Sequence, residues 1–551
     1  MRRSSIHIIA AVSCLLFALA AVRLNSEFSF ARAAEPAAPP QAAKIGEVKI
    51  EPVAATVPVP KVEIPEPKFS SPTELYTARR GDTIPALAHQ YLKNTSYLTS
   101  SELADAIRAS NGNRASNILK PGEQIAIPGI LPAPIVEHTI PVAKDFEVRA
   151  IYLTGIMAAS DHGLRIIRHW RQVGGNAVVF DIKDSDGSVT IPFEHPLLGK
   201  HQVYIHDLPK FVHFLHSENM HAIARIAIFR DERLVVTHPE LAVHSHKTGQ
   251  PWRENGKLVW TDSSNPIVQD YNIALAKFVA QSGADEIQFD YVRFPAEGDQ
   301  KDAAFVYQTG QAESENQQHP CGDGRLGRPA DAKQGGTEER HAPKSSATTA
   351  ACQVPRGMQR SDVITAFLKK AYAELHPTGV LLSLDVFGVM AWQRQVDLSH
   401  TGQDIVGMAK YCDVLSPMIY PSHFFGMDNI EHPGDAPEHF IGESMQRFEL
   451  ITHPDGNKNT GVVIRPWLQA FHWRTKTYSP EYIKIQVATA KEKGGIGFLF
   501  WNAANDYSKP YEAMPEMKTE DLKQKEKYFR GDELPSVAVK AALTPAEPAI
   551  H

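Results

Sequence analysis

The stretch Glu286-Ile-Gln-Phe-Asp290 has the composition of a short buried β-strand in which apolar and polar side chains alternate. Because successive side chains of a strand point to opposite faces, Ile287 and Phe289 would face one side, and Gln288 and Asp290 the other. The strand therefore presents a carboxylate, Asp290, at its C-terminal end.

Seven further runs of similar length lie on either side of this strand in the sequence, and amphipathic stretches with helical periodicity separate them. The eight predicted strands cover residues 149–154, 177–182, 222–228, 286–290, 380–385, 414–420, 462–468 and 496–501. The predicted helices include residues 207–217, 265–281, 361–374 and 480–493. Eight strands alternating with helices predict an α/β fold, a parallel (β/α)8 barrel, over residues 131–513.

Barrel enzymes carry their chemistry at the C-terminal ends of the strands. The alternation that turns Asp290 inward also turns Asp181 and Asp385 inward, so three carboxylates are expected at one mouth. Other strand ends are expected to add polar and aromatic side chains, namely Arg225, Tyr420, Arg465, Trp467, Gln469 and Trp501. Aromatic rings stack on sugar rings and polar groups bind hydroxyls, so a polysaccharide is the predicted substrate.

Several motifs at the predicted strand ends carry a family resemblance. They are Phe289-Asp-Tyr-Val-Arg-Phe-Pro295, Asp385-Val-Phe-Gly388, Ser416-Pro-Met-Ile-Tyr-Pro-Ser-His423 and Pro466-Trp-Leu-Gln-Ala-Phe471. Over roughly residues 148–511 the chain resembles a family of bacterial glycoside hydrolases within the broad clan of retaining barrel glycosidases. The resemblance implies hydrolysis of a glycosidic bond between two carboxyl groups.

The resemblance also implies roles for individual residues. Related barrels place the nucleophile or stabilising carboxylate at the end of strand four, which here is Asp290, and Arg293 is expected to hold it ionised. Asp385 is the first choice for the acid/base and Asp181 the second. Relatives often draw the acid from strand six, where this sequence has no carboxylate before Asp428 on the following loop.

Two side chains near the mouth, Asp181 and His423, have competing interpretations. For Asp181, a salt bridge to Lys183 or Arg225 inside the barrel is held equal to a catalytic role. His423 follows Ser422, but no Gly-x-Ser-x-Gly elbow accompanies the pair, so we expect His423 to hydrogen-bond substrate.

No metal or other cofactor is predicted. His244 and His246 lie two residues apart, but the sequence offers no third ligand at a matching spacing.

A smaller module is predicted over residues 73–130, ahead of the barrel. Its first motif is Tyr76-Thr-Ala-Arg-Arg-Gly-Asp-Thr-Ile84, and its last is a Pro121-Gly122 turn leading to Ile125-Ala-Ile-Pro128. Local signals predict a β-α-α-β unit whose first helix is capped by Asp82 or Thr83. The whole module resembles the LysM family, which implies binding of peptidoglycan or another N-acetylglucosamine-containing glycan. That groove would be formed by Gly81, Asp82, Thr83, Ile84, Asn111, Gly112 and Asn113. The alternative is a LysM fold that only spaces or oligomerises the protein.

The N-terminal residues predict export. A basic start, an apolar run over residues 6–22 and Ala31-Arg-Ala33 form the pattern of a signal peptide, 1–33, with an uncleaved membrane anchor as the alternative. A Pro- and Ala-rich spacer is predicted over 34–72. Together these segments predict a periplasmic or wall-associated protein.

Composition limits the remaining possibilities. The net charge of −6 gives no reason to expect a nucleic-acid partner. Residues 297–360 are predicted to form an irregular insertion, in which Cys321 and Cys352 could form a bridge, and residues 514–551 a flexible tail. Cys412 is expected to be a buried apolar residue.

Two functions compete with hydrolysis. The barrel could bind a glycan without cleaving it, since the expected strand-six acid is missing. It could also be an envelope scaffold whose insertion recruits a protein.

Overall fold

The computed structural model describes residues 72–308, 357–456 and 461–517. They form two compact units divided between Ile135 and Val136, called here the N-terminal unit and the barrel unit. The predicted signal peptide, the spacer up to residue 71, and Cys321 and Cys352 lie outside the described residues. Within those ranges, no helix has the length and apolar character needed to cross a bilayer.

The N-terminal unit has the predicted β-α-α-β order. Its elements are β1 (Glu74–Thr77), α2 (Ile84–Tyr91), the 3-10 turn η1 (Leu92–Asn94), α3 (Ser100–Ser110) and β2 (Gln124–Ile127). The two strands pair antiparallel. Ile84, Leu87, Leu103 and Ile107 of the helices pack with Ile125 of β2 in a small core.

Closed parallel pairing confirms the barrel. Its strands are β3 (Val148–Leu153), β4 (Ala177–Lys183), β5 (His221–Ala227), β9 (Glu286–Asp290), β11 (Leu381–Phe387), β12 (Val414–Ile419), β13 (Val463–Ile464) with β14 (Trp467–Gln469), and β15 (Gly497–Trp501). The ring closes because β15 pairs with β3 and β11 pairs with β12. Each predicted strand is therefore present, within two residues of its expected bounds.

Proline explains why the seventh strand is in two pieces. Pro466 lies between β13 and β14, and it has no N–H to donate to the ladder. Its carbonyl still accepts a hydrogen bond from Leu499 N at 3.0 Å, which keeps β15 in register. Both Arg465 and Trp467 face the interior of the barrel. Arg465 lies on the N-terminal side of the break and Trp467 on its C-terminal side, toward the strand ends.

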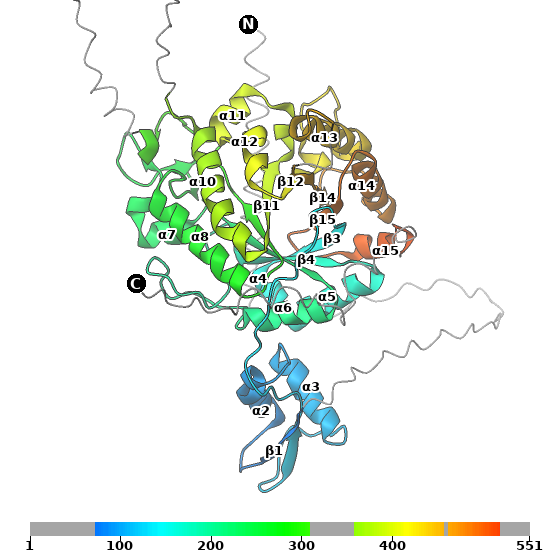
Figure 1. The fold of residues 1–551 in the computed structure, drawn as a ribbon. Helices are drawn as coiled ribbons and strands as arrows, with labels where there is room; N and C mark the ends of the chain where they lie inside the picture. The colour runs from blue at the N-terminus through cyan, green and yellow to red at the C-terminus, as the bar shows by residue number, and fades with distance from the viewer. Residues whose placement is uncertain (1–71, 309–356, 457–460, 518–551) are drawn as a thin grey trace, which may run out of the picture. The chain divides into compact units, whose positions relative to one another are not determined.

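The longer helices surround the strands (Figure 1). They are α5 (Asp161–Val173), α6 (Leu208–Ser217), α8 (Pro266–Gln281), α10 (Arg360–Leu375), α13 (Pro437–Thr452), α14 (Pro480–Glu492) and α15 (Ser508–Met517). Shorter helical elements are α4 (Gly155–Ala158), α7 (Glu232–Thr237), η2 (Pro239–Leu241), η3 (His376–Thr378), η4 (Gly388–Trp392), α11 (Gln395–Thr401), α12 (Ile405–Met408), η5 (Ala409–Tyr411), η6 (Pro421–His423) and η7 (Pro433–Asp435).

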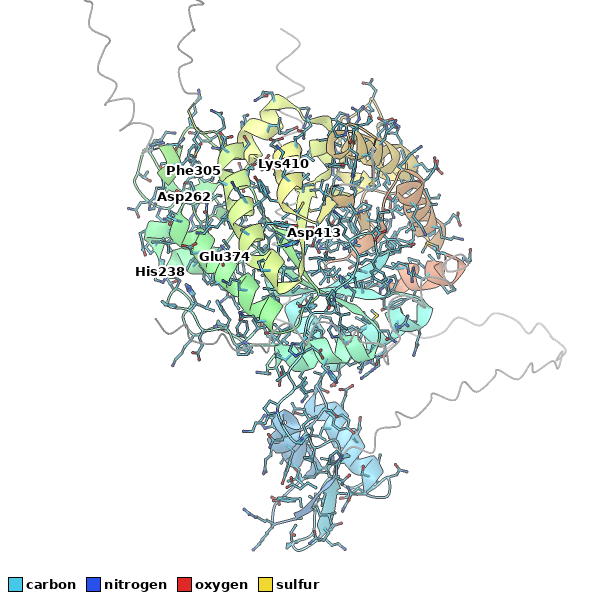
Figure 2. All side chains as sticks on the ribbon, viewed as in Figure 1. His238, Asp262, Phe305, Glu374, Lys410 and Asp413 are labelled. Atoms are coloured by element: carbon cyan, nitrogen blue, oxygen red, sulfur yellow. The ribbon has the colours of Figure 1, made fainter. Side chains whose placement is uncertain are left out.

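The insertion prediction is wrong for its first residues. Four short strands absent from the prediction lie on the loops after β5 and β9, namely β6 (His244–Ser245), β7 (Arg253–Glu254), β8 (Leu258–Val259) and β10 (Ala303–Ala304). β10 pairs with β6, and the backbone N of Val306 donates to Asp262 Oδ2 at 2.6 Å. Asp262 and Phe305 are labelled in Figure 2 on this side of the barrel. Two aromatic residues, Phe305 and Tyr307, anchor the segment by packing on Phe294, and the polar average composition hides these contacts.

One further boundary differs from the prediction, and one residue agrees with it. The tail was expected to begin at residue 514, but Met514 is buried and α15 continues to Met517. Cys412 is buried, as predicted.

Candidate active site

Arg225 on β5 links two of the three predicted carboxylates at the mouth of the barrel. Its Nη1 donates to Asp181 Oδ1 at 2.5 Å, while Nε and Nη2 donate to Asp290 Oδ2 at 3.1 and 2.6 Å. The guanidinium is therefore fixed between strands β4 and β9. The salt bridge considered for Asp181 is present, and its partner is Arg225.

Lys183 takes no part in this site. A register shift between Asp181 and Lys183 interrupts the alternation of β4. The Lys183 ammonium instead donates to Asp231 Oδ2 and Asn272 Oδ1, each at 2.8 Å, in a fully buried position.

Asp290 is held by donors on both oxygens. Besides the two bonds from Arg225, its Oδ1 accepts the backbone N–H of Tyr291 at 2.6 Å. Tyr291 has φ of 53°, in the left-handed region that a bulky residue rarely adopts. Such strain costs about 1–3 kcal/mol and persists only where the surroundings impose it. Three donors therefore fix the position of the Asp290 carboxyl group.

Asp385 lies in a different environment. Burial and the negative charge of Asp290 raise the pKa of Asp385 well above its usual value. Its Oδ1 accepts the indole N–H of Trp467 at 2.6 Å and the amide of Gln288 at 2.8 Å. Because an indole N–H can only donate, Oδ1 must be an acceptor, and a proton on Asp385 would sit on Oδ2.

Asp290 and Asp385 lie at the same level on neighbouring strands. Phe289 is in register with Leu384, so the next residue of each strand is one of the two acids. Adjacent strands are about 4.8 Å apart, which brings the two carboxyl groups to one place on the barrel wall.

Asp181 is the third acid of this group. Burial raises the pKa of Asp181 to about 7, although the charge of Arg225 lowers it. The hydroxyl of Tyr152 on β3 donates to its Oδ2 at 2.5 Å. With both oxygens bonded to protein groups, Asp181 is placed to orient Arg225 rather than to contact a sugar.

Aromatic side chains form the opposite wall of the mouth, along β12, β14 and β15. Tyr420 lies 5.8 Å from Trp501 and 5.7 Å from Phe471 between ring centroids. Phe471 and Trp501 meet edge to face at 5.3 Å. Trp501 keeps part of its ring exposed. The predicted aromatic residues therefore do gather at the mouth.

Two of the predicted arginine roles are wrong. Arg293 makes no ion pair with Asp290, because its guanidinium lies on the rings of Trp260 and Phe387, 4.6 Å from each centroid. Arg465 is fully buried and its Nη1 donates to Glu286 Oε2 at 2.8 Å. Glu286 begins β9, so Arg465 belongs to the N-terminal end of the barrel, away from the mouth.

Gln469 and His423 face mainly protein groups. The Gln469 amide donates to the carbonyl of Phe471 at 3.1 Å and accepts from Ser422 N at 3.2 Å. The His423 ring lies tilted against that of Trp473, with ring centroids 4.9 Å apart, and burial lowers the pKa of His423 to about 3. Direct binding of substrate by either side chain is not supported by these positions.

Asp428 does not replace a strand-six acid. Its Oδ2 accepts from His439 Nε2 at 2.8 Å on the loop after β12, where both side chains are exposed.

Four residues at the mouth were not named as site residues from the sequence: Tyr152, Gln288, Arg230 and Phe471. Gln288 had been placed inward by strand parity, and the same parity gives Tyr152 its inward position on β3. Arg230 and Phe471 lie on loops after strand ends, where no periodic signal exists.

Metal coordination has no candidate in the described ranges. They contain no group of three or more His, Cys, Asp or Glu side chains that could hold a metal ion.

The predicted groove residues of the N-terminal unit divide into two sets. The side chains of Thr83, Asp82 and Asn111 are used internally: Thr83 caps α2, Asp82 accepts from Tyr76 Oη at 2.7 Å, and Asn111 bonds to both polar groups of the Ala126 backbone at 2.9 Å. Gly81, Gly112 and Asn113 have positive φ of 94°, 77° and 53° and shape the loops. Ile84 is buried. Any groove here would therefore offer backbone groups and loop shape.

Comparisons with solved structures and with protein families found the following similarities. In structure, the chain is similar to a hypothetical protein from Ruminiclostridium thermocellum, with 30% identity, 43% of this chain and 97% of that chain covered, and a TM-score of 0.31. It is also similar to the PgaB (BpsB) glycoside hydrolase domain from Bordetella bronchiseptica, with 13% identity, 67% and 99% coverage, and a TM-score of 0.45. A third similar structure is the spore cortex-lytic enzyme SleL from Bacillus megaterium, with 11% identity, 80% and 85% coverage, and a TM-score of 0.34. No protein of curated function matches the chain.

A family model decides the assignment. Residues 150–507, nearly the whole barrel and more than half of the chain, match the family described as "Putative glycosyl hydrolase domain". The match begins within β3 and ends at the residue before α15, so it includes every strand that contributes to the mouth. The chain belongs to this family of barrel glycoside hydrolases.

Proposed function

We propose that the barrel hydrolyses a glycosidic bond of a cell-envelope polysaccharide with Asp385 as general acid and Asp290 as nucleophile or stabilising carboxylate. One observation carries the assignment: two adjacent carboxyl groups have opposite environments, with three donors on Asp290 and a buried Asp385 whose pKa is raised. Pairs of titratable groups driven apart in this way divide the acid and base roles.

The proposed chemistry follows from the hydrogen bonds. Asp385 donates the proton on Oδ2 to the departing glycosidic oxygen, because Oδ1 is occupied by Trp467 and Gln288. The charged Asp290 attacks or stabilises the sugar carbon that becomes positive. The close register of β9 and β11 favours the short carboxyl separation of retaining enzymes, about 5–5.5 Å.

The proposal about where the protein acts depends on the N-terminal unit. We infer that it is a LysM module that binds peptidoglycan or another N-acetylglucosamine-containing glycan after export to the periplasm or cell wall. Its β-α-α-β order and the turns at Gly81 and Gly112 support this. Attachment to a polymer raises the local concentration of neighbouring substrate.

The test is to incubate the purified mature protein with a panel of envelope glycans that includes peptidoglycan, and to follow new reducing ends by mass spectrometry. Products from the wild type that disappear in Asp290→Asn support the proposal. Asp270→Asn is the matched control, because Asp270 is exposed on the outer helix α8, where it pairs with Lys370. If both wild type and Asp290→Asn bind glycan and neither yields product, the barrel is a binding protein.

Two further measurements define the mechanism. Proton NMR of the first product gives its anomeric form, and inversion would contradict the retaining geometry. Asp428→Asn tests the remaining loop carboxylate: full activity in this variant is expected, and its loss would move the acid role from Asp385.

A further inference from the structure

Two arginines at the mouth lie on one aromatic cluster, made of Trp260, Tyr291 and Phe387. Arg230 on the loop after β5 lies 5.3 Å from the Tyr291 ring centroid, and its Nη1 donates to the Tyr291 hydroxyl at 3.0 Å. Arg293 on the loop after β9 lies 4.6 Å from the Phe387 centroid and 5.4 Å from that of Tyr291. Tyr291 is thus contacted by both guanidinium groups.

Neither arginine is neutralised by a salt bridge. In the described parts of the chain, no carboxylate lies within 4.0 Å of either guanidinium, whereas Arg225 and Arg465 both have such partners. The protein acceptor that bonds Arg293 is the carbonyl of Phe294, at 3.2 Å from Nη1. Each guanidinium has five N–H donors, and only Nη1 of each is used in the hydrogen bonds to Tyr291 and Phe294, so donors remain for a ligand. Both side chains are partly buried.

Asp184 and Glu254, two acidic groups whose charges act on Arg230, are already bonded elsewhere. Their charges help to raise the pKa of Arg230, although burial acts in the opposite direction. Glu254, however, accepts Trp260 Nε1 at 2.8 Å on one oxygen and the Glu297 backbone N at 2.8 Å on the other. Asp184 accepts the backbone N of Ser185 at 2.5 Å.

The cluster adjoins the two proposed catalytic acids in the chain. Tyr291 directly follows Asp290, and its left-handed backbone sets the direction of its ring. Phe387 lies two residues beyond Asp385 at the end of β11, on the same face of the strand. A sugar ring held between Asp290 and Asp385 would therefore have the Arg230 and Arg293 guanidinium groups at its edge.

A third arginine has a related setting on the other side of the mouth. Arg474, after β14, lies 4.0 Å from the Phe425 centroid and 4.5 Å from that of Trp473, and it has no salt bridge within the described ranges. Its side chain is exposed. A cation on each side suits a polymer that carries negative charge at more than one sugar.

We propose that the substrate is an acidic polysaccharide and that Arg230 and Arg293 bind the anionic group of the sugar beside Asp290 and Asp385. This inference rests on the proposed function and names its substrate class. A planar guanidinium binds carboxylate or sulfate oxygens through paired N–H donors, and the aromatic faces keep both groups oriented. A bound anion would also compensate cations that are otherwise partly buried without a partner.

The binding experiment uses saturation-transfer NMR with the full chain and three monosaccharide probes at millimolar concentration: D-glucuronate, D-glucose 6-sulfate and D-glucose. Saturation transfer to the two anionic probes but not to glucose is the expected result. A response to one anionic probe alone still supports the proposal and identifies the anion. Equal transfer to glucose, or none to either anionic probe, overturns it.

Variants link that signal to the two arginines. Arg230→Gln/Arg293→Gln should weaken anionic binding about tenfold or more, equivalent to ~1.4 kcal/mol per tenfold, and Arg474→Gln should weaken it less. Arg447→Gln is the matched control, because Arg447 also lies on an aromatic ring, that of Trp392 at 4.9 Å, but pairs with Glu443. Unchanged binding in the double variant overturns the proposal.

Asp290→Asn separates this inference from the proposed function. The variant should keep anionic binding, because it removes a negative charge near the site, while hydrolysis measured by reducing ends is lost. Binding without hydrolysis in the wild type would leave the anionic site standing and contradict the glycosidase function.

Discussion

The two ends of the barrel interior both contain buried charges, but they are balanced differently. At the N-terminal end, Glu286 is paired with Arg465 at 2.8 Å and with His221 at 3.1 Å, and although burial opposes it, the positive charge of Arg465 contributes to lowering the pKa of Glu286 to about 2. At the C-terminal end, Arg225 pairs with both Asp181 and Asp290. Asp385 makes no salt bridge in the described structure, and burial and the charge of Asp290 raise its pKa although the charge of Arg225 lowers it.

This difference suggests that the charges at the N-terminal end serve stability and those at the C-terminal end serve catalysis. A paired buried charge has one stable protonation state and contributes to a fixed structure. A buried acid without a salt bridge, whose pKa is raised, can hold the proton that a general acid must donate. Variants at the two ends should therefore affect different quantities.

The largest expected effect is on catalysis, at Asp385. Asp385→Asn removes the proton donor, so kcat on the identified substrate should fall about 10²–10⁴-fold. The free energy of unfolding should stay the same or rise above neutral pH, because the variant removes an uncompensated charge. Chemical denaturation and reducing-end assays measure the two quantities, with Asp270→Asn as control. A large loss of stability would show that Asp385 resembles the paired charges of the other end.

At the N-terminal end, a variant should reduce stability strongly and activity little, the reverse of Asp385→Asn. Arg465→Met leaves Glu286 buried without its main partner, and the free energy of unfolding should fall by about 3–5 kcal/mol. The Arg465→Met/Glu286→Gln double variant should recover much of that loss. Activity at low temperature should remain near that of the wild type. A matched surface pair, Lys277 with Glu374 (labelled in Figure 2), provides the control, since Lys277→Met should cost about 1 kcal/mol or less.

The pH dependence of stability sharpens the same comparison. Burial alone would lower the pKa of His216, but its bonds to Asp285 at 3.0 Å and Glu137 at 3.4 Å raise it to about 9. Since the folded pKa lies above the ordinary value of 6.5, the stabilisation is complete below pH 6.5 and is lost as pH rises toward 9. The loss should amount to roughly 3 kcal/mol at most. In His216→Gln, the free energy of unfolding from denaturation curves should depend less on pH across this range. An unchanged dependence on pH would assign the effect to another group.

The sequence predicted the barrel well because its signals are periodic. Strand parity alone turned Asp181, Asp290 and Asp385 inward, and all three are at the mouth. It failed at the register shift of β4, which turns Lys183 away from the interior. Parity also gives no depth along a strand, so it could not show that Arg465, which faces the interior, lies beside Glu286 at the N-terminal end. Parity also cannot say which cation meets which acid, so Arg293 was assigned to Asp290 when Arg225 holds it.

Trp467 offers the smallest and most specific effect. Its indole N–H donates to Asp385 Oδ1 at 2.6 Å and favours the charged form of that acid. Trp467→Phe keeps an aromatic ring but removes the donor, so the pKa of Asp385 should rise further. Hydrogen bonds to charged groups contribute about 1.5–3 kcal/mol, and 1.36 kcal/mol corresponds to one pKa unit. Because activity needs protonated Asp385, the alkaline limb of the kcat profile should move upward by about one pH unit or more. An unmoved limb would mean that another group donates the proton, and a limb moved downward would mean that the protonated acid, rather than the charged one, receives the indole bond.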